Sequence, residues 1–197
     1  MNESIADFEN PYLKEADTYV SEDPFHIPAT PGSLRRREEL IAKYGFAVPT
    51  RRAIQTIVDH DPIIEVGAGC GYWARCIADA GGEIIATDER PIDERWEKRW
   101  FPVWKGSGQD MAVDYPHRTL LLVWPTYADT WPTEVLGRYH SAGGETVIYV
   151  GEGPGGCNAD DRFHQMLAED WLEVETVTIP SWPAIHDDLT VYTREEP

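Results

Sequence analysis

The stretch that decides the fold reads Ile63-Ile64-Glu65-Val66-Gly67-Ala68-Gly69-Cys70-Gly71-Tyr72-Trp73. Its first four residues form an apolar run around one acid, which is typical of a buried strand. The alternating glycines that follow predict a tight turn, because a backbone without Cβ atoms can turn sharply and come close to a ligand. The stretch therefore predicts a strand, a glycine turn and a helix, which together form the first unit of an α/β sheet.

Six further apolar or β-branched runs predict the rest of that sheet. They cover residues 83–87, 102–104, 119–124, 146–150, 172–178 and 189–193. Continuous apolar runs are typical of parallel strands that are covered on both faces. Only a proline-rich loop separates the last two runs, which favours an antiparallel hairpin. We expect an α/β fold with a doubly wound, mostly parallel seven-stranded sheet, a C-terminal antiparallel hairpin and helices on both faces.

The segments between these runs predict the helices. Ser33 and Thr50 are candidate caps of two helices ahead of the first strand. Other helices are expected after the glycine turn and over residues 93–100, 131–140 and 162–171. Residues 1–32 carry many acids and four prolines, so we expect an extended arm with at most a short helix around residues 12–19. Residues 33–197 are expected to form a single domain.

The composition indicates a globular protein with a strongly acidic surface. Hydrophobic residues make up 42% of the 197 residues, which is enough for one domain with a core. Seventeen basic against 35 acidic residues give a net charge of −18, which repels phosphate and disfavours nucleic acid as a partner. A surface that is acidic and poor in lysine resembles proteins of salt-loving organisms, where salt screens the repulsion.

The sequence also bears on compartment and metals. It contains no apolar run long enough to cross a membrane, and its first residues lack the basic and apolar regions of a signal peptide. We therefore expect a cytoplasmic protein with no membrane partner. The three cysteines have neither metal-ligand nor disulfide-framework spacing, so we expect reduced thiols and no metal.

The glycine spacing narrows the class of ligand. Asp88 ends the second predicted strand, where a carboxylate can accept hydrogen bonds from ribose hydroxyls, as in any adenosine-containing cofactor site. A dinucleotide fingerprint has glycines at its first, third and sixth positions, and the sixth position counted from Gly67 is Tyr72. Pyrophosphate binding is therefore disfavoured.

The pattern Glu65-x-Gly67-x-Gly69-x-Gly71 instead resembles the first motif of class I S-adenosylmethionine-dependent methyltransferases. With Asp88 and the terminal hairpin, the resemblance covers about residues 44–194. It implies a methyltransferase in which Glu65, Gly67 and Gly69 line the methionine moiety, Asp88 holds the ribose, and the adenine lies near Glu89 and the loop around Ser107. The cofactor-binding residues that it implies are Tyr44, Glu65, Gly67, Ala68, Gly69, Gly71, Asp88, Glu89, Ser107 and Trp124.

The acceptor side matches the family less well. Amino-directed methyltransferases have a polar residue, two prolines and an aromatic residue after the fourth strand, whereas this chain has Trp124-Pro125-Thr126-Tyr127. A flat ring at Trp124 could stack on a planar acceptor. Glu152 lies in a glycine-dense loop after the fifth strand, where it could act as a base or hold a cation. Tyr127 and Glu152 are the candidate catalytic residues, and a small-molecule acceptor is favoured.

Three alternatives remain open at this point. The chain could methylate amino groups of nucleic acid, it could bind the cofactor without catalysis, or it could be a nicotinamide-dependent oxidoreductase. A series of tryptophans, Trp96, Trp100 and Trp104, is expected to lie in the core or in a pocket wall rather than to act in catalysis.

Overall fold

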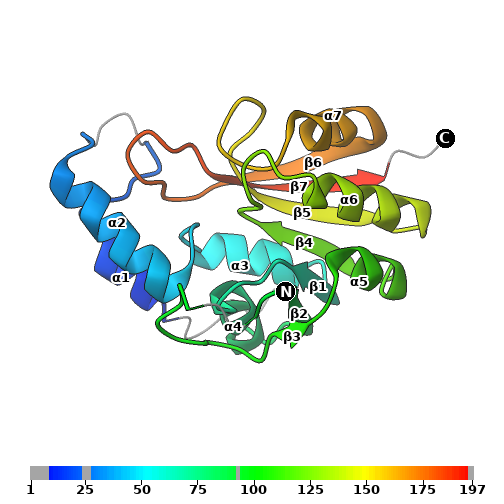
Figure 1. The fold of residues 1–197 in the computed structure, drawn as a ribbon, viewed down its shortest axis with the longest axis horizontal. Coiled ribbons are helices and arrows are strands. Elements are labelled where there is room, and N and C mark those ends of the chain that lie inside the picture. Colours follow the sequence, from blue (N-terminus) through cyan, green and yellow to red (C-terminus); the bar gives the residue numbers. More distant parts are fainter. Residues whose placement is uncertain (1–8, 24–27, 92–93, 195–197) are drawn as a thin grey trace.

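A computed structural model describes residues 9–23, 28–91 and 94–194 of the chain (Figure 1). Within these residues seven strands form one sheet in the order β3-β2-β1-β4-β5-β7-β6. The strands β1 to β5 pair in parallel, and β7 pairs antiparallel with both β5 and β6. The predicted fold class is confirmed. The strands are β1 Ile63–Val66, β2 Ile84–Asp88, β3 Trp104–Lys105, β4 Thr119–Val123, β5 Thr146–Gly151, β6 Trp171–Thr178 and β7 Asp188–Arg194.

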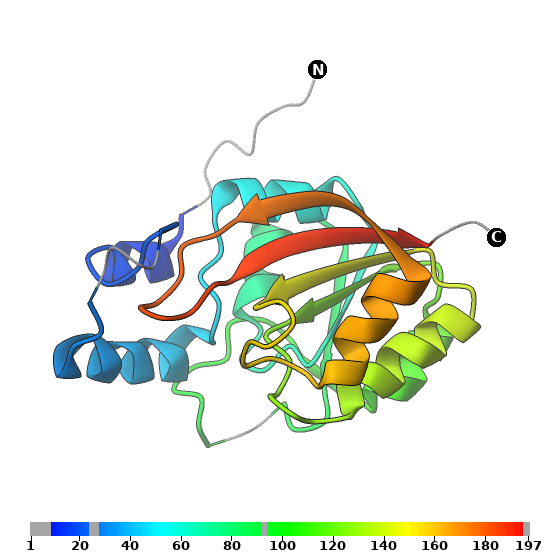
Figure 2. The same ribbon diagram turned by 90° about the horizontal axis from the view of Figure 1, so that it is seen from above.

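Helices cover both faces of the sheet (Figure 2). On one face Ile63 of β1 packs in a cluster with residues of α3 and α4, and on the other face Ile64 packs with residues of α5, α6 and α7. This division follows from the period of two along a strand, which sends neighbouring side chains to opposite faces. The helices are α1 Pro11–Ala16, α2 Pro31–Tyr44, α3 Arg51–Val58, α4 Tyr72–Asp79, α5 Gly108–Asp114, α6 Trp131–Ser141 and α7 Asp161–Asp170.

The helix caps agree with the sequence at one position and differ at another. Thr50 caps α3 as predicted, because its hydroxyl accepts a hydrogen bond from the Ala53 N–H at 3.1 Å. Ser33 was expected to cap α2, and this prediction is wrong. Thr30 is the cap, and Ser33 lies one turn inside the helix, where the two side chains form a reciprocal capping box.

The described residues before β3 are irregular where a helix was predicted. Residue 93 of the predicted helix lies outside the described residues, and residues 94–100 have no helical structure. The N–H of Glu97 donates to Ala42 O, and the N–H of Trp100 donates to Cys70 O, both at 2.9 Å. These backbone groups therefore bond to distant segments rather than to their own preceding turn. We call residues 94–101 the cover segment, because they lie across the glycine turn.

The N-terminal helices pack at the end of the sheet where the site lies. The arrowheads of β4 and β5 point toward the blue helices α1 and α2 (Figure 2). Tyr12 of α1 is completely buried and stacks on Tyr44 of α2, with ring centroids 4.9 Å apart. Residues 1–8 and 24–27 of the predicted arm lie outside the described residues, whereas the described part contributes α1 to the core. Among the described helices, none is long and apolar enough to span a membrane.

Candidate functional site

The glycine turn after β1 has the sharp backbone that its sequence requires. Gly67 and Gly69 have φ angles of 78° and 54°, a region that side chains with a Cβ rarely occupy. The N–H groups of Gly67 and Ala68 both donate to the carbonyl of Thr87, at 2.9 and 3.0 Å. The turn is therefore tied directly to the end of the neighbouring strand β2.

Asp88 joins this turn to the segment that follows β2. Its Oδ2 accepts a hydrogen bond from the Gly69 N–H at 2.9 Å, and its Oδ1 accepts one from the Arg90 N–H at 2.7 Å. A carboxylate oxygen can accept two hydrogen bonds, so each oxygen keeps a position for a ligand hydroxyl. The carboxylate is held in place by backbone groups and still has capacity to bind.

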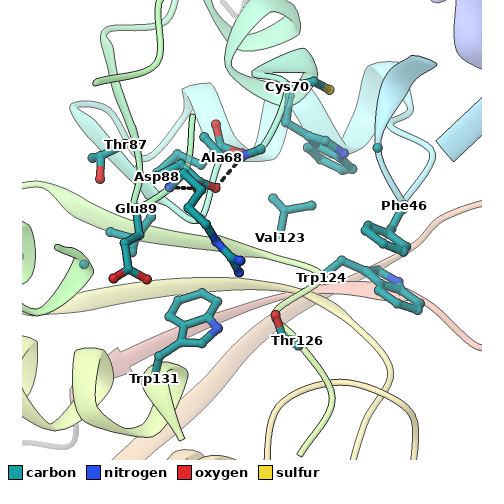
Figure 3. A pocket seen from close by; sticks show the side chains of 18 of the residues that line it. Phe46, Ala68, Cys70, Thr87, Asp88, Glu89, Val123, Trp124, Thr126 and Trp131 are labelled. Atoms are coloured by element: carbon teal, nitrogen blue, oxygen red, sulfur yellow. Dashed lines mark hydrogen bonds between the residues drawn. The ribbon is translucent and has the colours of Figure 1, made fainter. Parts of the chain in front are cut away.

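A cavity of about 290 Å³ opens at the carboxyl ends of β1, β2 and β4. Figure 3 shows Asp88 and Glu89 on one side, Phe46 and Trp124 on the opposite side, and Val123 between them. Ligands of open α/β sheets bind at this edge of the sheet. The lining residues are Tyr44, Gly45, Phe46, Glu65, Val66, Gly67, Ala68, Gly69, Cys70, Tyr72, Trp73, Thr87, Asp88, Glu89, Arg90, Arg95, Trp96, Gly106, Ser107, Gly108, Gln109, Val123, Trp124, Thr126, Asp129 and Trp131.

Glu65 is a buried carboxyl group among the residues that line this cavity. It is 2% exposed, and its Oε2 has no hydrogen-bond partner. Its pKa is raised to about 8, mainly by burial and also by the charge of Asp88, while a hydrogen bond from the Ala74 backbone acts in the opposite direction. An unpartnered polar atom in a buried position is costly, so it marks a place where a ligand group would be favourable.

Two tryptophans pack directly on the glycine turn. A Cβ placed on Gly67 would lie 2.9 Å from Cη2 of Trp131, the first residue of α6. A Cβ placed on Gly69 would lie 2.9 Å from Cζ2 of Trp96 in the cover segment. The turn therefore needs glycine for close packing as well as for its backbone angles.

A stacked ring pair closes the end of the cavity opposite Asp88. The rings of Phe46 and Trp124 are 4.6 Å apart and inclined by only 3°. The indole N–H of Trp124 donates to Oδ1 of Asp187 at 2.8 Å, and the guanidinium carbon of Arg37 lies 5.6 Å from the indole centroid. The carboxylate of Asp187 is 3% exposed, and its burial raises its pKa to about 7. Three distant segments thus fix the position of this ring.

The structure brings most of the predicted cofactor-binding residues together. All of them line the cavity except Gly71, which faces Val103 and Phe101 of the region before β3. Their roles toward a cofactor stay predictions. The residues that line the cavity as expected are Tyr44, Glu65, Gly67, Ala68, Gly69, Asp88, Glu89, Ser107 and Trp124.

The structure places the two candidate catalytic residues outside the cavity lining. Tyr127 is 66% exposed. Glu152 is buried, and its carboxylate accepts hydrogen bonds from the N–H and Sγ of Cys157 and from the N–H of His186. Burial raises the pKa of Glu152, but these hydrogen bonds outweigh burial and hold it below its usual value. Glu152 therefore holds its own loop, through Cys157, against the loop that contains His186.

The tryptophan series has a mixed outcome. Trp96 lines the cavity, and Trp100 stacks on Tyr44 at 5.1 Å, as a pocket or core position requires. Trp104 is 65% exposed on the edge strand β3, so the expectation for it is wrong. β3 is a two-residue strand at the edge of the sheet, so no neighbouring strand covers the Trp104 ring on its outer side.

Trp131, Thr126 and Asp129 line the cavity but were not predicted from the sequence to do so. A signal for Trp131 was present, because it begins the helix after β4. The loop and the helix N-terminus after a parallel strand lie at the ligand edge of the sheet. Among the described residues, no group of three or more histidine, cysteine or acidic side chains is arranged to hold a metal.

The comparisons with known proteins agree with the fold. No protein-family model and no curated protein matches the sequence. The structure is similar to magnesium protoporphyrin IX methyltransferase (ChlM) from Synechocystis PCC 6803 with bound SAM. The TM-score is 0.53 at 10% identity, over 94% of this chain and 95% of that one. The same enzyme with bound SAH gives a TM-score of 0.54 at 9% identity, over 94% of this chain and 98% of that one. The chain has the α/β fold of this methyltransferase.

Proposed function

We propose that this protein is an S-adenosylmethionine-dependent methyltransferase with a small-molecule acceptor. The observation that carries the proposal is the buried, unpartnered Oε2 of Glu65, which lies beside a glycine turn that is bonded to Asp88. These groups lie in one cavity at the ligand edge of the sheet. The fold shared with a methyltransferase whose structures hold SAM and SAH supports the proposal.

The residues of the cavity fit the parts of this cofactor. The unpartnered oxygen of Glu65 would hold the methionine ammonium, because a positive group there relieves the cost of a buried carboxylate. Asp88 would accept hydrogen bonds from the ribose hydroxyls through its remaining lone pairs. Glu89, Ser107 and Gln109, which line the same cavity, would surround the adenine.

The chain would contribute to catalysis mainly by position and by exclusion of water. When bound, the cofactor supplies a methyl group on a positively charged sulfur. Trp96 and Trp131 lie against the turn on both sides, so their rings would shield that region from water and interact favourably with positive charge. Holding two reactants in line can account for much of the rate of such a displacement.

The geometry speaks against a nicotinamide dinucleotide. A pyrophosphate would need the open N-terminus of α4. The Trp100 N–H bonds to Cys70 O just before this terminus, and a Cβ on Gly71 would lie 3.0 Å from Cβ of Phe101. Tyr72 fills the first helical position and is 2% exposed. The cover segment therefore occupies the space that a pyrophosphate would take.

Titration calorimetry with S-adenosylmethionine, S-adenosylhomocysteine and NAD, at low and high salt, tests the proposal. We expect both sulfur compounds to bind and NAD not to bind. Asp88→Ala should lower the affinity for both sulfur compounds by about tenfold to a hundredfold, which is the typical contribution of hydrogen bonds to a charged group. Asp114→Ala, an exposed acid outside the cavity, is the matched control. Binding of NAD without either sulfur compound would overturn the proposal.

A further inference from the structure

Four aromatic rings from four separate segments line the cavity. Phe46 follows α2, Trp96 belongs to the cover segment, Trp124 follows β4, and Trp131 begins α6. Each of these side chains is only half-buried, although all four lie in the cavity wall. Uncovered aromatic surface in a wall is available to a ligand.

Two of the four rings lie next to the site proposed for the methyl donor. Trp96 and Trp131 touch the glycine turn at Gly69 and Gly67, which would line the methionine end of the proposed cofactor. Phe46 meets Trp96 edge to face, with centroids 6.4 Å apart and planes inclined by 88°, and stacks on Trp124. Phe46, Trp96 and Trp124 therefore form one continuous set of rings, and Trp131 adds a fourth ring against the turn at Gly67.

We propose that the methyl acceptor is a small planar aromatic molecule that lies against the ring wall formed by Phe46, Trp96, Trp124 and Trp131. This inference rests on the proposed function. Aromatic rings pack favourably edge to face or with offset stacking, and the wall offers both orientations. A saturated molecule of the same size would make the apolar contacts but would lose this preference.

The same observations argue against a base within nucleic acid as the acceptor. A flipped base is also planar, but the phosphates around it need basic surface. The cavity lining includes four acids, Glu65, Asp88, Glu89 and Asp129, against the two arginines Arg90 and Arg95, and the whole chain carries a net charge of −18. The acceptor should therefore carry no phosphate.

The transfer itself balances with groups that the two substrates supply. A lone pair on oxygen, nitrogen or sulfur of the acceptor forms the bond to the methyl carbon. The bond from this carbon to the positively charged sulfur breaks, and its electron pair stays on sulfur. A proton on the acceptor atom leaves to water.

The test uses naphthol and its fully saturated analogue, decahydronaphthol, as probes. Binding of each to the full-length protein saturated with S-adenosylhomocysteine is measured by calorimetry and by saturation-transfer NMR. We expect naphthol to bind about tenfold more tightly, since two or three aromatic contacts each contribute a factor of about two to twelve. A phosphorylated single-stranded oligonucleotide is expected not to bind.

Variants of Phe46 assign the preference to the ring wall. Phe46→Leu should lower the affinity for naphthol by about threefold to tenfold, whereas Phe46→Tyr should keep the wild-type affinity. Trp104→Leu removes an exposed ring outside the cavity and should leave it unchanged. The affinity for S-adenosylhomocysteine should stay the same in all three variants, which also shows that they fold.

The outcomes separate the two proposals. If S-adenosylhomocysteine does not bind, the proposed function fails. If it binds but decahydronaphthol binds as well as naphthol, or Phe46→Leu has no effect on naphthol, the aromatic acceptor is overturned and the methyltransferase remains. Tighter binding of the oligonucleotide than of naphthol would also overturn the acceptor class.

Discussion

The two halves of the cavity are built in different ways. The donor half consists of the glycine turn and Asp88, which lie at the ends of neighbouring parallel strands. Backbone N–H groups of the turn donate to Thr87 O and to the Asp88 carboxylate. The acceptor half consists of Phe46, Trp96 and Trp124, which meet from three segments far apart in the sequence. Backbone hydrogen bonds hold the first half, and side-chain packing holds the second.

This difference indicates which half can vary. A backbone site depends on glycines and on one carboxylate, so few substitutions preserve it. A site made of packed rings depends on the elements behind it, which include α1 and the loop before β7. We therefore expect changes far from the cavity to alter the acceptor half and to leave the donor half intact.

The largest expected effect comes from α1, which supports the acceptor half. Tyr12 is fully buried, its hydroxyl donates to Gly45 O at 3.0 Å, and Trp182 donates to that hydroxyl at 3.4 Å. Tyr12→Ala should lower the free energy of unfolding by about 3–5 kcal/mol, as for other large buried aromatics. Tyr127→Ala, at an exposed ring, should change it by less than about 0.5 kcal/mol. Chemical denaturation measures both. If the two substitutions lowered the free energy of unfolding equally, α1 would not support the acceptor half through Tyr12.

The second prediction concerns the buried acid of the donor half. The pKa of Glu65 is raised to about 8, from 4.5, so folding favours its protonated form. Its contribution to stability is fully present below about pH 4.5 and is lost as the pH rises through about 8. Glu65→Gln should remove this loss, which is on the order of a few kcal/mol.

Binding gives a second readout for the same group. A methionine ammonium would favour the ionised carboxylate, so binding near neutral pH should release about one proton. Calorimetry in buffers of different ionisation enthalpy measures this release in the wild type and in Glu65→Gln. Proton release that is the same in both proteins would assign it to another group.

The same contrast explains what could be predicted from the sequence. The strands, the turn and Asp88 were predictable because short-range patterns determine them. The cover segment was wrongly predicted as a helix because Trp96 and Trp100 gain more by packing on Gly69 and Tyr44 than a helix would provide. The helix α5 was missed, although Ser107 with an acid three residues later is a capping signal.

Glu152 shows more clearly what cannot be predicted from the sequence. Glu152 was chosen because it follows a strand in a glycine-rich loop. Its carboxylate accepts hydrogen bonds from Cys157 in the same loop and from His186 in the loop between β6 and β7. Sequence position indicates the edge of the sheet on which a side chain lies, but only tertiary packing decides what it faces.

The third prediction tests the turn itself with a matched pair of glycines. Gly69 and Gly81 both have positive φ, of 54° and 91°. A Cβ on Gly69 would meet Trp96 at 2.9 Å, whereas a Cβ on Gly81 would have no atom within 4 Å. Each alanine should cost about 1–2 kcal/mol from its backbone angle. Only Gly69→Ala should also weaken S-adenosylhomocysteine binding, by about tenfold. Equal binding by the two variants would mean that the turn does not contact the ligand.

The smallest expected effect lies in the acceptor half, at Asp187. Its pKa is raised to about 7, mainly by burial and also by Glu152 and Asp188, while Trp124 and Arg37 act in the opposite direction. As the pH falls through about 7, the carboxylate gains a proton, and its hydrogen bond from the Trp124 indole weakens because it is no longer assisted by charge. The ring pair of Trp124 should then become less firmly held.

The indole N–H signal of Trp124 in an NMR spectrum reports this directly, and Trp124→Phe assigns it. The signal should move with a midpoint near pH 7 in the wild type and should not move in Asp187→Asn, which keeps an oxygen acceptor without the titration. The affinity for naphthol should fall by about twofold to threefold over the same range, since less than one aromatic contact is lost. Binding of S-adenosylhomocysteine should not follow the state of Asp187, because backbone groups hold the turn and Asp88. A naphthol affinity that keeps its pH dependence in Asp187→Asn would show that this carboxylate does not position the ring.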